Sequence, residues 1–167
     1  REAVAHFPNN TVCRNGFGET LREIGRLDDA REVFEQTRRD FPDNTVCRTG
    51  LGDLLIDMDD EQAAAEVYRE ALTLDACDRY ARGGLARALS VLSARRQDTA
   101  LRDEAKGMLQ DLADEGNHDA RARLRDFDDQ WQRATTDRSV KFRRETDGQS
   151  QPARQQPGRA ISDMSIA

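Results

Sequence analysis

The sequence predicts an all-α fold built from repeated helix pairs. Residues 7–18 recur as residues 41–52, an offset of 34 residues, and a fainter third copy follows from Tyr80. Repeats of this length are typical of stacked supersecondary units. Charged residues make up 35% of the 167-residue chain and aromatic residues only 5%. This composition suits amphipathic helices in contact with water and argues against a β-sandwich or a β-barrel.

Residues 9–42 form the first predicted repeat, which contains two helices. The first helix has an apolar stripe at spacings of three to five residues, made of Val12, Phe17, Leu21 and Ile24. Gly25 is placed to end this helix in a left-handed conformation, and Asp28 is placed to cap the second helix. The second helix has a stripe of Ala30, Val33, Phe34 and Thr37. Pro42 ends it, because proline cannot continue the hydrogen-bond ladder of a helix.

The same plan places the neighbouring repeats. Residues 43–76 form the second repeat, and residues 77–117 form the third, with an insertion near residues 93–99. Residues 1–8 are expected to be the end of a preceding repeat's second helix. Since the chain opens at Arg1 without a methionine, we expect it to be an internal fragment of a longer protein.

Residues 118–134 are predicted to form a capping helix, whose apolar stripe is Ala120, Leu124, Phe127, Trp131 and Ala134. One face of such a helix closes the last apolar surface of an array while the other stays in water. Residues 135–167 are rich in Gln, Ser, Pro and Gly towards their end, which predicts a flexible tail. Within it, residues 138–144 are basic and amphipathic. We expect this segment to support self-association with the acidic body of the chain or of a neighbouring copy.

The two clear copies resemble the tetratricopeptide repeat. The family pattern of an aromatic residue, Leu, Gly and Tyr in one helix and Ala, Phe and Pro in the next falls on Arg14, Phe17, Gly18, Leu21, Ala30, Phe34 and Pro42. In the second copy the matching residues are Arg48, Leu51, Gly52, Leu55, Ala64, Tyr68 and Ala76. Arginine stands where the family usually has the bulky aromatic residue. The resemblance implies an α-α superhelix, a right-handed solenoid of antiparallel helix pairs with the C-terminal capping helix at its end.

The resemblance also implies a concave groove lined mainly by the first helix of each repeat. Transferred to this sequence, the lining positions are Val12, Asn15, Glu19, Arg22 and Glu23, then Val46, Thr49, Asp53, Ile56 and Asp57, then Tyr80, Gly83, Arg87 and Ser90. These residues are candidates for binding a peptide.

The charges in this predicted groove set the expected partner. Chaperone-binding members of the family hold a terminal carboxylate with Lys, Arg and Asn at such positions. Glu19, Glu23, Asp53 and Asp57 stand there instead, so we do not expect that carboxylate clamp. Acidic and apolar residues together predict a peptide with basic and apolar side chains. The alternative, that the acidic residues only solvate a helix face, stays open.

Two sets of residues recur at equivalent positions and have two interpretations each. Arg14, Arg48 and Arg82 either pair with acidic residues such as Asp40 and Asp75, which is the favoured interpretation, or form a cationic ladder for an anionic partner. The glycines Gly16, Gly50 and Gly84 indicate either a close approach of two backbones or an open groove surface.

Several function classes are disfavoured. No set of residues combines a nucleophile, a base or a metal in one place, so we expect no enzyme and no cofactor. Cys13, Cys47 and Cys77 lack metal-ligand spacing. Cys13 and Cys47 occupy equivalent positions in successive repeats and are expected to be small buried apolar residues, and the spacing of neighbouring helices disfavours a disulfide between them. A net charge of -6 opposes nucleic-acid binding, and no apolar run approaches the length of about 20 residues that spans a membrane.

The sequence therefore predicts a scaffold or adaptor that binds a protein or peptide in the concave groove of the array. The alternative is a regulatory or oligomerisation module of a larger, multidomain protein. The few cysteines favour a reducing compartment, so we expect a cytoplasmic location.

Overall fold

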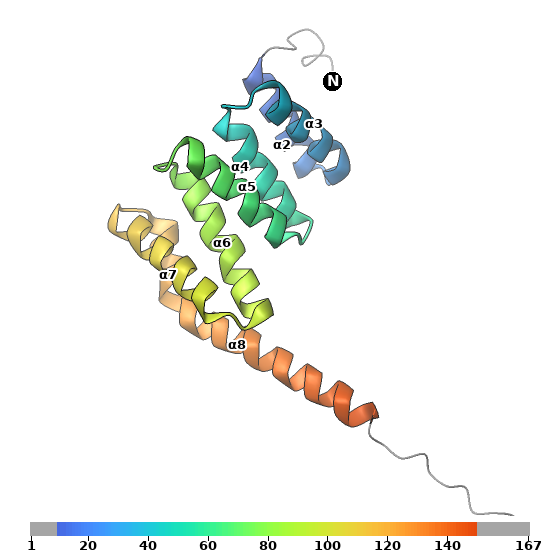
Figure 1. Cartoon of the computed structure of the whole chain (residues 1–167), viewed down its shortest axis with the longest axis vertical. Coiled ribbons are helices and arrows are strands. Elements are labelled where there is room, and N and C mark those ends of the chain that lie inside the picture. Colours follow the sequence, from blue (N-terminus) through green and yellow to red (C-terminus); the bar gives the residue numbers. More distant parts are fainter. Residues whose placement is uncertain (1–9, 150–167) are drawn as a thin grey trace, which may run out of the picture. The chain divides into compact units, whose positions relative to one another are not determined.

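The computed structural model describes the backbone of residues 10–149 and the side chains of residues 10–136. This part of the chain is helical, without strands (Figure 1). Its helices are α2 (Thr11–Glu23), α3 (Leu27–Asp40), α4 (Thr45–Asp57), α5 (Glu61–Leu74), α6 (Arg79–Arg96), α7 (Thr99–Asp114) and α8 (His118–Gln149). The chain divides into two compact units, residues 1–135 and residues 136–167. The predicted all-α superhelix is confirmed.

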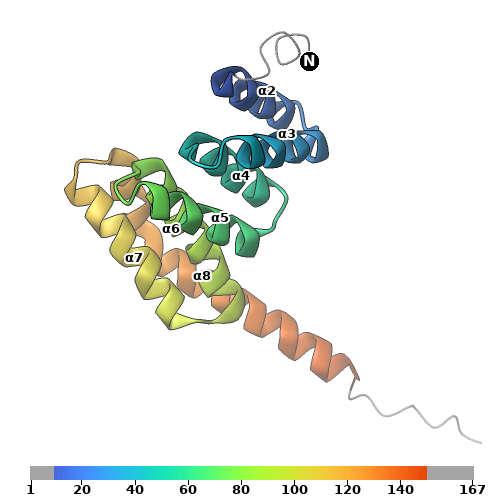
Figure 2. The same ribbon diagram turned by 45° about the horizontal axis from the view of Figure 1, so that its top comes forward.

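Consecutive helices of the first unit form antiparallel pairs: α2 with α3, α4 with α5, and α6 with α7 (Figures 1 and 2). Each pair packs on the next through its second helix, α3 against α4 and α5 against α6. The first helices also contact one another in succession, α2 against α4 and α4 against α6. The first helices therefore lie in a row, and side chains at the same position of each repeat become neighbours.

The start of each first helix is fixed by a side-chain cap. The amide oxygens of Asn10 and Asn44 each accept a hydrogen bond of 3.1 Å from the backbone N–H three residues later. The carboxylate of Asp78 and the amide of Asn117 do the same for α6 and α8. Asp28 does not cap α3 as predicted: the helix already begins at Leu27, so this residue lies in its first turn.

The turn between the two helices of a repeat needs a left-handed residue. Gly25 ends the first turn with φ of 77°, and Asp59 occupies the equivalent place 34 residues later with φ of 60°. The third repeat absorbs its insertion by lengthening helices instead of a loop. Helix α6 has 18 residues where α4 has 13, and α7 has 16 where α5 has 14.

The recurring glycines decide how closely the pairs approach. The ring of Phe34 on α3 lies between Gly18 and Gly50, where an added Cβ would come within 2.7 Å of it. A Cβ added at Gly84 would lie 2.2 Å from the Tyr68 ring on α5, whereas one at Gly16 meets nothing within 4 Å. Close packing therefore explains Gly50 and Gly84, whereas the space beside Gly16 is open within the described chain.

Helix α8 corrects the predicted C-terminal boundary. It continues to Gln149 instead of ending at residue 134, so the prediction of a weakly structured tail is wrong for residues 135–149. The physical reason is that no glycine or proline occurs between Gly116 and Gly148, so nothing interrupts the helix. Ala120 and Phe127 join the core of the first unit, as expected for the capping part. The basic segment 138–144 has a helical backbone, but its side chains lie outside the described residues, as do residues 1–9 and 150–167.

Candidate interaction surface

The first helices expose a row of apolar side chains at one repeat position. Val12, Val46 and Tyr80 stand 34 residues apart, each in the first turn of its helix, and are 78%, 59% and 86% exposed. Exposed apolar side chains that align across neighbouring elements mark interaction sites more often than isolated ones do. We call Val12, Val46 and Tyr80 the apolar ladder.

Most acidic residues of the predicted groove are bound to arginines of the same groove. A guanidinium nitrogen of Arg22 lies 2.7 Å from a carboxylate oxygen of Asp57, and another lies 2.9 Å from Glu19. Burial alone would lower the pKa of Arg22, but the hydrogen bonds to Asp57 and Glu19 raise it above its ordinary value. An ion pair thus joins α2 of the first repeat to α4 of the second.

A second ion pair joins the second and third repeats. Arg87 donates to Asp53 at 2.6 Å, and the buried Tyr68 hydroxyl donates to the same carboxylate oxygen at 2.7 Å. Burial, reinforced by the charge of Asp53, raises the pKa of the Tyr68 hydroxyl above its ordinary value. Asp53 therefore belongs to the packing between repeats. One of its carboxylate oxygens already accepts two hydrogen bonds, which leaves fewer acceptor positions for a ligand than the sequence indicates.

The remaining predicted groove residues differ in exposure. Glu23 is exposed. Asn15 is buried, and its side-chain oxygen has no hydrogen-bond partner in the described part of the chain. Thr49 donates to the backbone of Val46, and Ile56 packs against the core. The structure thus places Asn15 and Ile56 mainly in packing, while the side chains of the apolar ladder and of Glu23 are exposed to solvent.

The arginine series is explained by pairing within each repeat. Arg14 is bound to Asp40, the predicted partner. Arg82 donates to both carboxylate oxygens of Glu115 at 2.7 Å. Arg48 does not pair with Asp75: it donates to the backbone oxygen of its own N-cap residue, and its Nε lies 3.7 Å from a carboxylate oxygen of Glu70.

The cysteines differ from one another. All three are free thiols; Cys47 is buried, Cys13 is half-buried and Cys77 is exposed. The prediction of small buried apolar residues therefore holds fully only for Cys47. Burial raises the pKa of its thiol.

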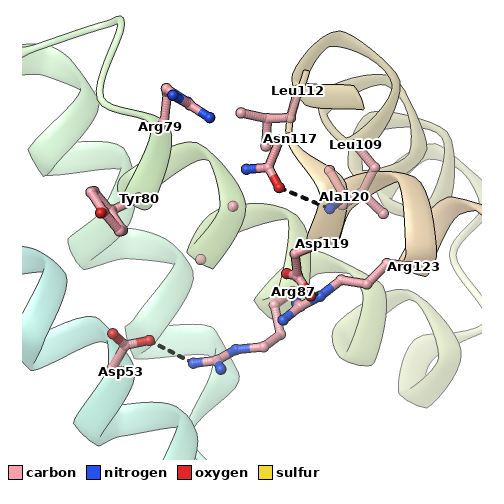
Figure 3. Close-up of a pocket in the computed structure, with 12 residues that line it drawn as sticks. Asp53, Arg79, Tyr80, Arg87, Leu109, Leu112, Asn117, Asp119, Ala120 and Arg123 are labelled. Carbon is pink, nitrogen blue, oxygen red and sulfur yellow. Dashed lines mark hydrogen bonds and ion pairs between the residues drawn. The ribbon is translucent and has the colours of Figure 1, made fainter. Parts of the chain in front are cut away.

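A pocket of about 290 Å³ lies at the end of the row of first helices, between α6 and the start of α8 (Figure 3). We call it the α6–α8 pocket. Its polar lining residues are Asp53, Arg79, Tyr80, Arg87, Asn117, Asp119 and Arg123. The helix surface of Gly83 and Gly84 forms another wall, and Leu109, Leu112 and Ala120 supply apolar contacts.

The pocket exists because the third repeat lacks a side chain that the first two have. Gly83 stands where Asn15 and Thr49 stand in the earlier repeats, and a Cβ there would meet only a Leu112 methyl carbon, at 4.0 Å. The prediction included Gly83 and Arg87 but missed Arg79 and the residues from α8. The cap signal of Asn117, which repeats Asn10 and Asn44, marks the start of α8 in the sequence but not its position beside α6.

The comparisons with known proteins agree with this architecture. A family model described as tetratricopeptide repeat matches residues 47–76, which cover most of α4 and all of α5. The matched segment is a tetratricopeptide repeat. Arrays of this family are protein–protein interaction modules, and their fold is generally a scaffold rather than a catalytic one. The comparison with curated protein sequences gives no match.

Solved structures of MamA have a similar fold. One has a TM-score of 0.56 at 17% identity, covering 90% of this chain and 81% of that one. A second has a TM-score of 0.53 at 19% identity, covering 86% of each chain. A third, named MamA MSR-1, has a TM-score of 0.50 at 18% identity, and this chain spans 62% of its length. At such identities the similarity extends to the fold alone.

Within the residues that the structure describes, every helix is too short or too polar to cross a membrane.

Proposed function

We propose that this array binds a peptide segment of a partner protein along the row of first helices. The observation that carries the proposal is the apolar ladder, in which three equivalent and otherwise solvated side chains lie on successive first helices. A preformed row of this kind offers a partner apolar contacts without the entropic cost of ordering a flexible site.

The spacing of the helices sets the length of the segment. Neighbouring packed helices are about 8–10 Å apart, so the ladder extends over about 20 Å. A chain in the polyproline II conformation advances about 3.1 Å per residue with three residues per turn, so side chains three residues apart lie on one face. A partner with apolar side chains about three residues apart, over about six or seven residues, therefore matches all three rungs.

The charges beside the ladder favour basic side chains near the first two repeats. Glu19, Glu23 and Asp57 supply three carboxylates there and Arg22 one guanidinium. Pairing with Arg22 reduces the acidic field that the sequence predicts but leaves an excess of negative charge. This excess steers a basic segment towards the groove and weakens with salt.

Selection from a random display library of seven-residue to twelve-residue peptides tests the proposal. We expect enriched peptides with apolar residues about three positions apart. Tyr80→Ala should weaken their binding about tenfold or more, since a buried aromatic side chain contributes about 1.5–3 kcal/mol. Because Tyr80 is 86% exposed in the free chain, this substitution should leave folding unchanged.

Ile24→Ala is the matched control. Ile24 is also apolar and 62% exposed, but it lies at the end of α2, away from the ladder position. Its substitution should leave the affinities unchanged. Equal enrichment on wild type and on a variant with serine at all three rungs would refute the proposal.

A further inference from the structure

The apolar ladder selects a partner segment by the spacing of its apolar residues. Its rungs stand on successive first helices, which are about 8–10 Å apart. A chain in the polyproline II conformation places every third side chain on one face, about 9 Å from the previous one. A matching segment therefore has apolar residues at positions i, i+3 and i+6.

Outside the described helices, one segment of this sequence has that spacing. Ile161, Met164 and Ala167 stand three residues apart. Pro157 and Gly158, which are poor helix formers, precede them, so the sequence favours an extended segment over a helix.

Two other segments do not match the ladder. Val4 and Phe7 have the same spacing, but the third position is Asn10, whose side chain caps α2. The basic residues 138–144 have a helical backbone, which rises only about 1.5 Å per residue. Neither segment can place three apolar side chains on the three rungs.

The sizes of the side chains favour one direction of binding. The two valine rungs are small, so they accept the longer side chains of Ile161 and Met164. The third rung, Tyr80, is large and 86% exposed, and the small Ala167 fits opposite its ring. In this direction the segment runs from the first repeat to the third.

The charges favour the same direction. Arg154 and Arg159 precede Ile161, and no acidic residue lies between positions 150 and 162. The two arginines therefore reach the first repeat, where Glu23 is exposed and carboxylates outnumber guanidinium groups. The reversed direction brings them towards the arginines of α6, which is unfavourable.

The length of α8 favours a second copy of the chain as the source of the segment. Helix α8 has 32 residues, so it is about 48 Å long, and its start lies beside the Tyr80 rung. Residues 150–160 span at most about 40 Å when extended, which is less than the length of α8. A tail from another copy is free of this restriction.

We propose that residues 159–167 of one copy bind along the apolar ladder of a second copy. This inference rests on the proposed function, because it names the segment that the ladder binds. The tail and the ladder are different surfaces, so the contact is heterologous and leaves one free tail and one free ladder at the ends of each assembly. Assemblies therefore grow with concentration, and the tail competes with any other partner of the groove.

Sedimentation velocity of the full chain between about 10 μM and 1 mM measures the self-association. We expect the average mass to rise with concentration, and less steeply at high salt, because the arginines contribute electrostatic attraction. The double variant Ile161→Ser with Met164→Ser should weaken the association about tenfold or more, since two apolar contacts are lost. Ile166→Ser is the matched control: this residue is apolar and in the same segment but off the spacing, so its substitution should have no effect.

A mixing experiment separates the loss of a contact from the loss of the fold. Tyr80→Ala removes a rung and keeps the tail, whereas the double serine variant keeps the ladder and alters the tail. Each variant alone should stay monomeric at concentrations where wild type associates. Their mixture should form one-to-one complexes, because an intact tail meets an intact ladder, and a variant that had lost its fold could not restore association.

A peptide with the sequence of residues 154–167, acetylated and amidated at its ends, is the direct probe. It should dissociate the wild-type assemblies and shift the methyl NMR signals of Val12 and Val46. A mass that stays monomeric at all concentrations, equal effects of Ile166→Ser and the double serine variant, or association that persists in both variants alone would overturn the inference.

The peptide also distinguishes this inference from the proposed function. If peptides selected from the display library bind in a Tyr80-dependent way and the tail peptide does not, the groove function stands and the assignment of the tail is wrong. If neither kind of peptide binds, the proposed function itself fails. If the tail peptide binds while the full chain stays monomeric, the second copy is refuted as the source.

Discussion

Alanine substitution at two equivalent glycines should change stability in opposite directions. Both Gly16 and Gly84 lie inside a first helix, where replacing glycine with alanine stabilises by about 0.5–1 kcal/mol. At Gly16 an added Cβ meets nothing within 4 Å, so this gain is retained. At Gly84 the same Cβ would lie 2.2 Å from Cζ and 2.3 Å from Cε1 of Tyr68.

The Tyr68 ring cannot easily move away from that Cβ. It is 1% exposed, and its hydroxyl donates to Asp53 at 2.7 Å. Overpacking of this kind costs about 1–3 kcal/mol, and breaking the hydrogen bond to a carboxylate costs about 1–3 kcal/mol more. After subtraction of the helix gain, we expect Gly84→Ala to lower the free energy of unfolding by about 1–5 kcal/mol.

Urea unfolding followed by far-ultraviolet circular dichroism measures both effects by linear extrapolation. Gly16→Ala, at the same position of the first repeat, is the internal control for helix propensity. The double variant Gly84→Ala with Tyr68→Leu should lose less than the sum of the two single losses, because the leucine removes the clash. A Gly84→Ala protein as stable as wild type would refute the close packing that we describe between α5 and α6.

Three further outcomes follow from local geometry. Asp59 has φ of 60°, so Asp59→Gly should raise the free energy of unfolding by about 0.5–1 kcal/mol in the same urea assay. In a thiol titration of the native chain Cys77 should react first and Cys47 last, because Cys47 is buried and the pKa of its thiol is raised; a fast Cys47 would contradict its burial. The hydrogen bond from Arg82 lowers the pKa of the Glu115 carboxyl in the folded chain. The ionised carboxylate therefore stabilises the folded state at pH values above the unfolded-state pKa of about 4.3. This stabilisation is lost as the pH falls through the lowered pKa of the folded state. Wild type and Glu115→Gln should therefore differ in stability at neutral pH and become equal in acid, and a difference that persists in acid would point to another cause.

The repeat positions were predictable because they depend on local patterns. The apolar stripes and the turn at Gly25 each depend on a few neighbouring residues. The 34-residue offset is visible in the sequence because the same local pattern occurs again in the next repeat. The row formed by Val12, Val46 and Tyr80 follows from the same offset, since residues one repeat apart become neighbours when the pairs stack.

The state of the charges was not predictable in the same way. Glu19, Asp53 and Asp57 look like a free acidic surface in the sequence, yet arginines from the same or a neighbouring repeat bind them. Which residue binds which carboxylate depends on the distance between helices far apart in the sequence, and several arginines were equally plausible partners.

The sequence by itself determined the repeat and the helix pairs, because these follow from helical periodicity and turn chemistry. Only the tertiary structure decided that Gly84 serves close packing, that Asp53 belongs to the contact between repeats, and that α6 and α8 enclose a donor-rich pocket. Each of these depends on side chains from different helices meeting in space, and no single segment of the chain contains that information.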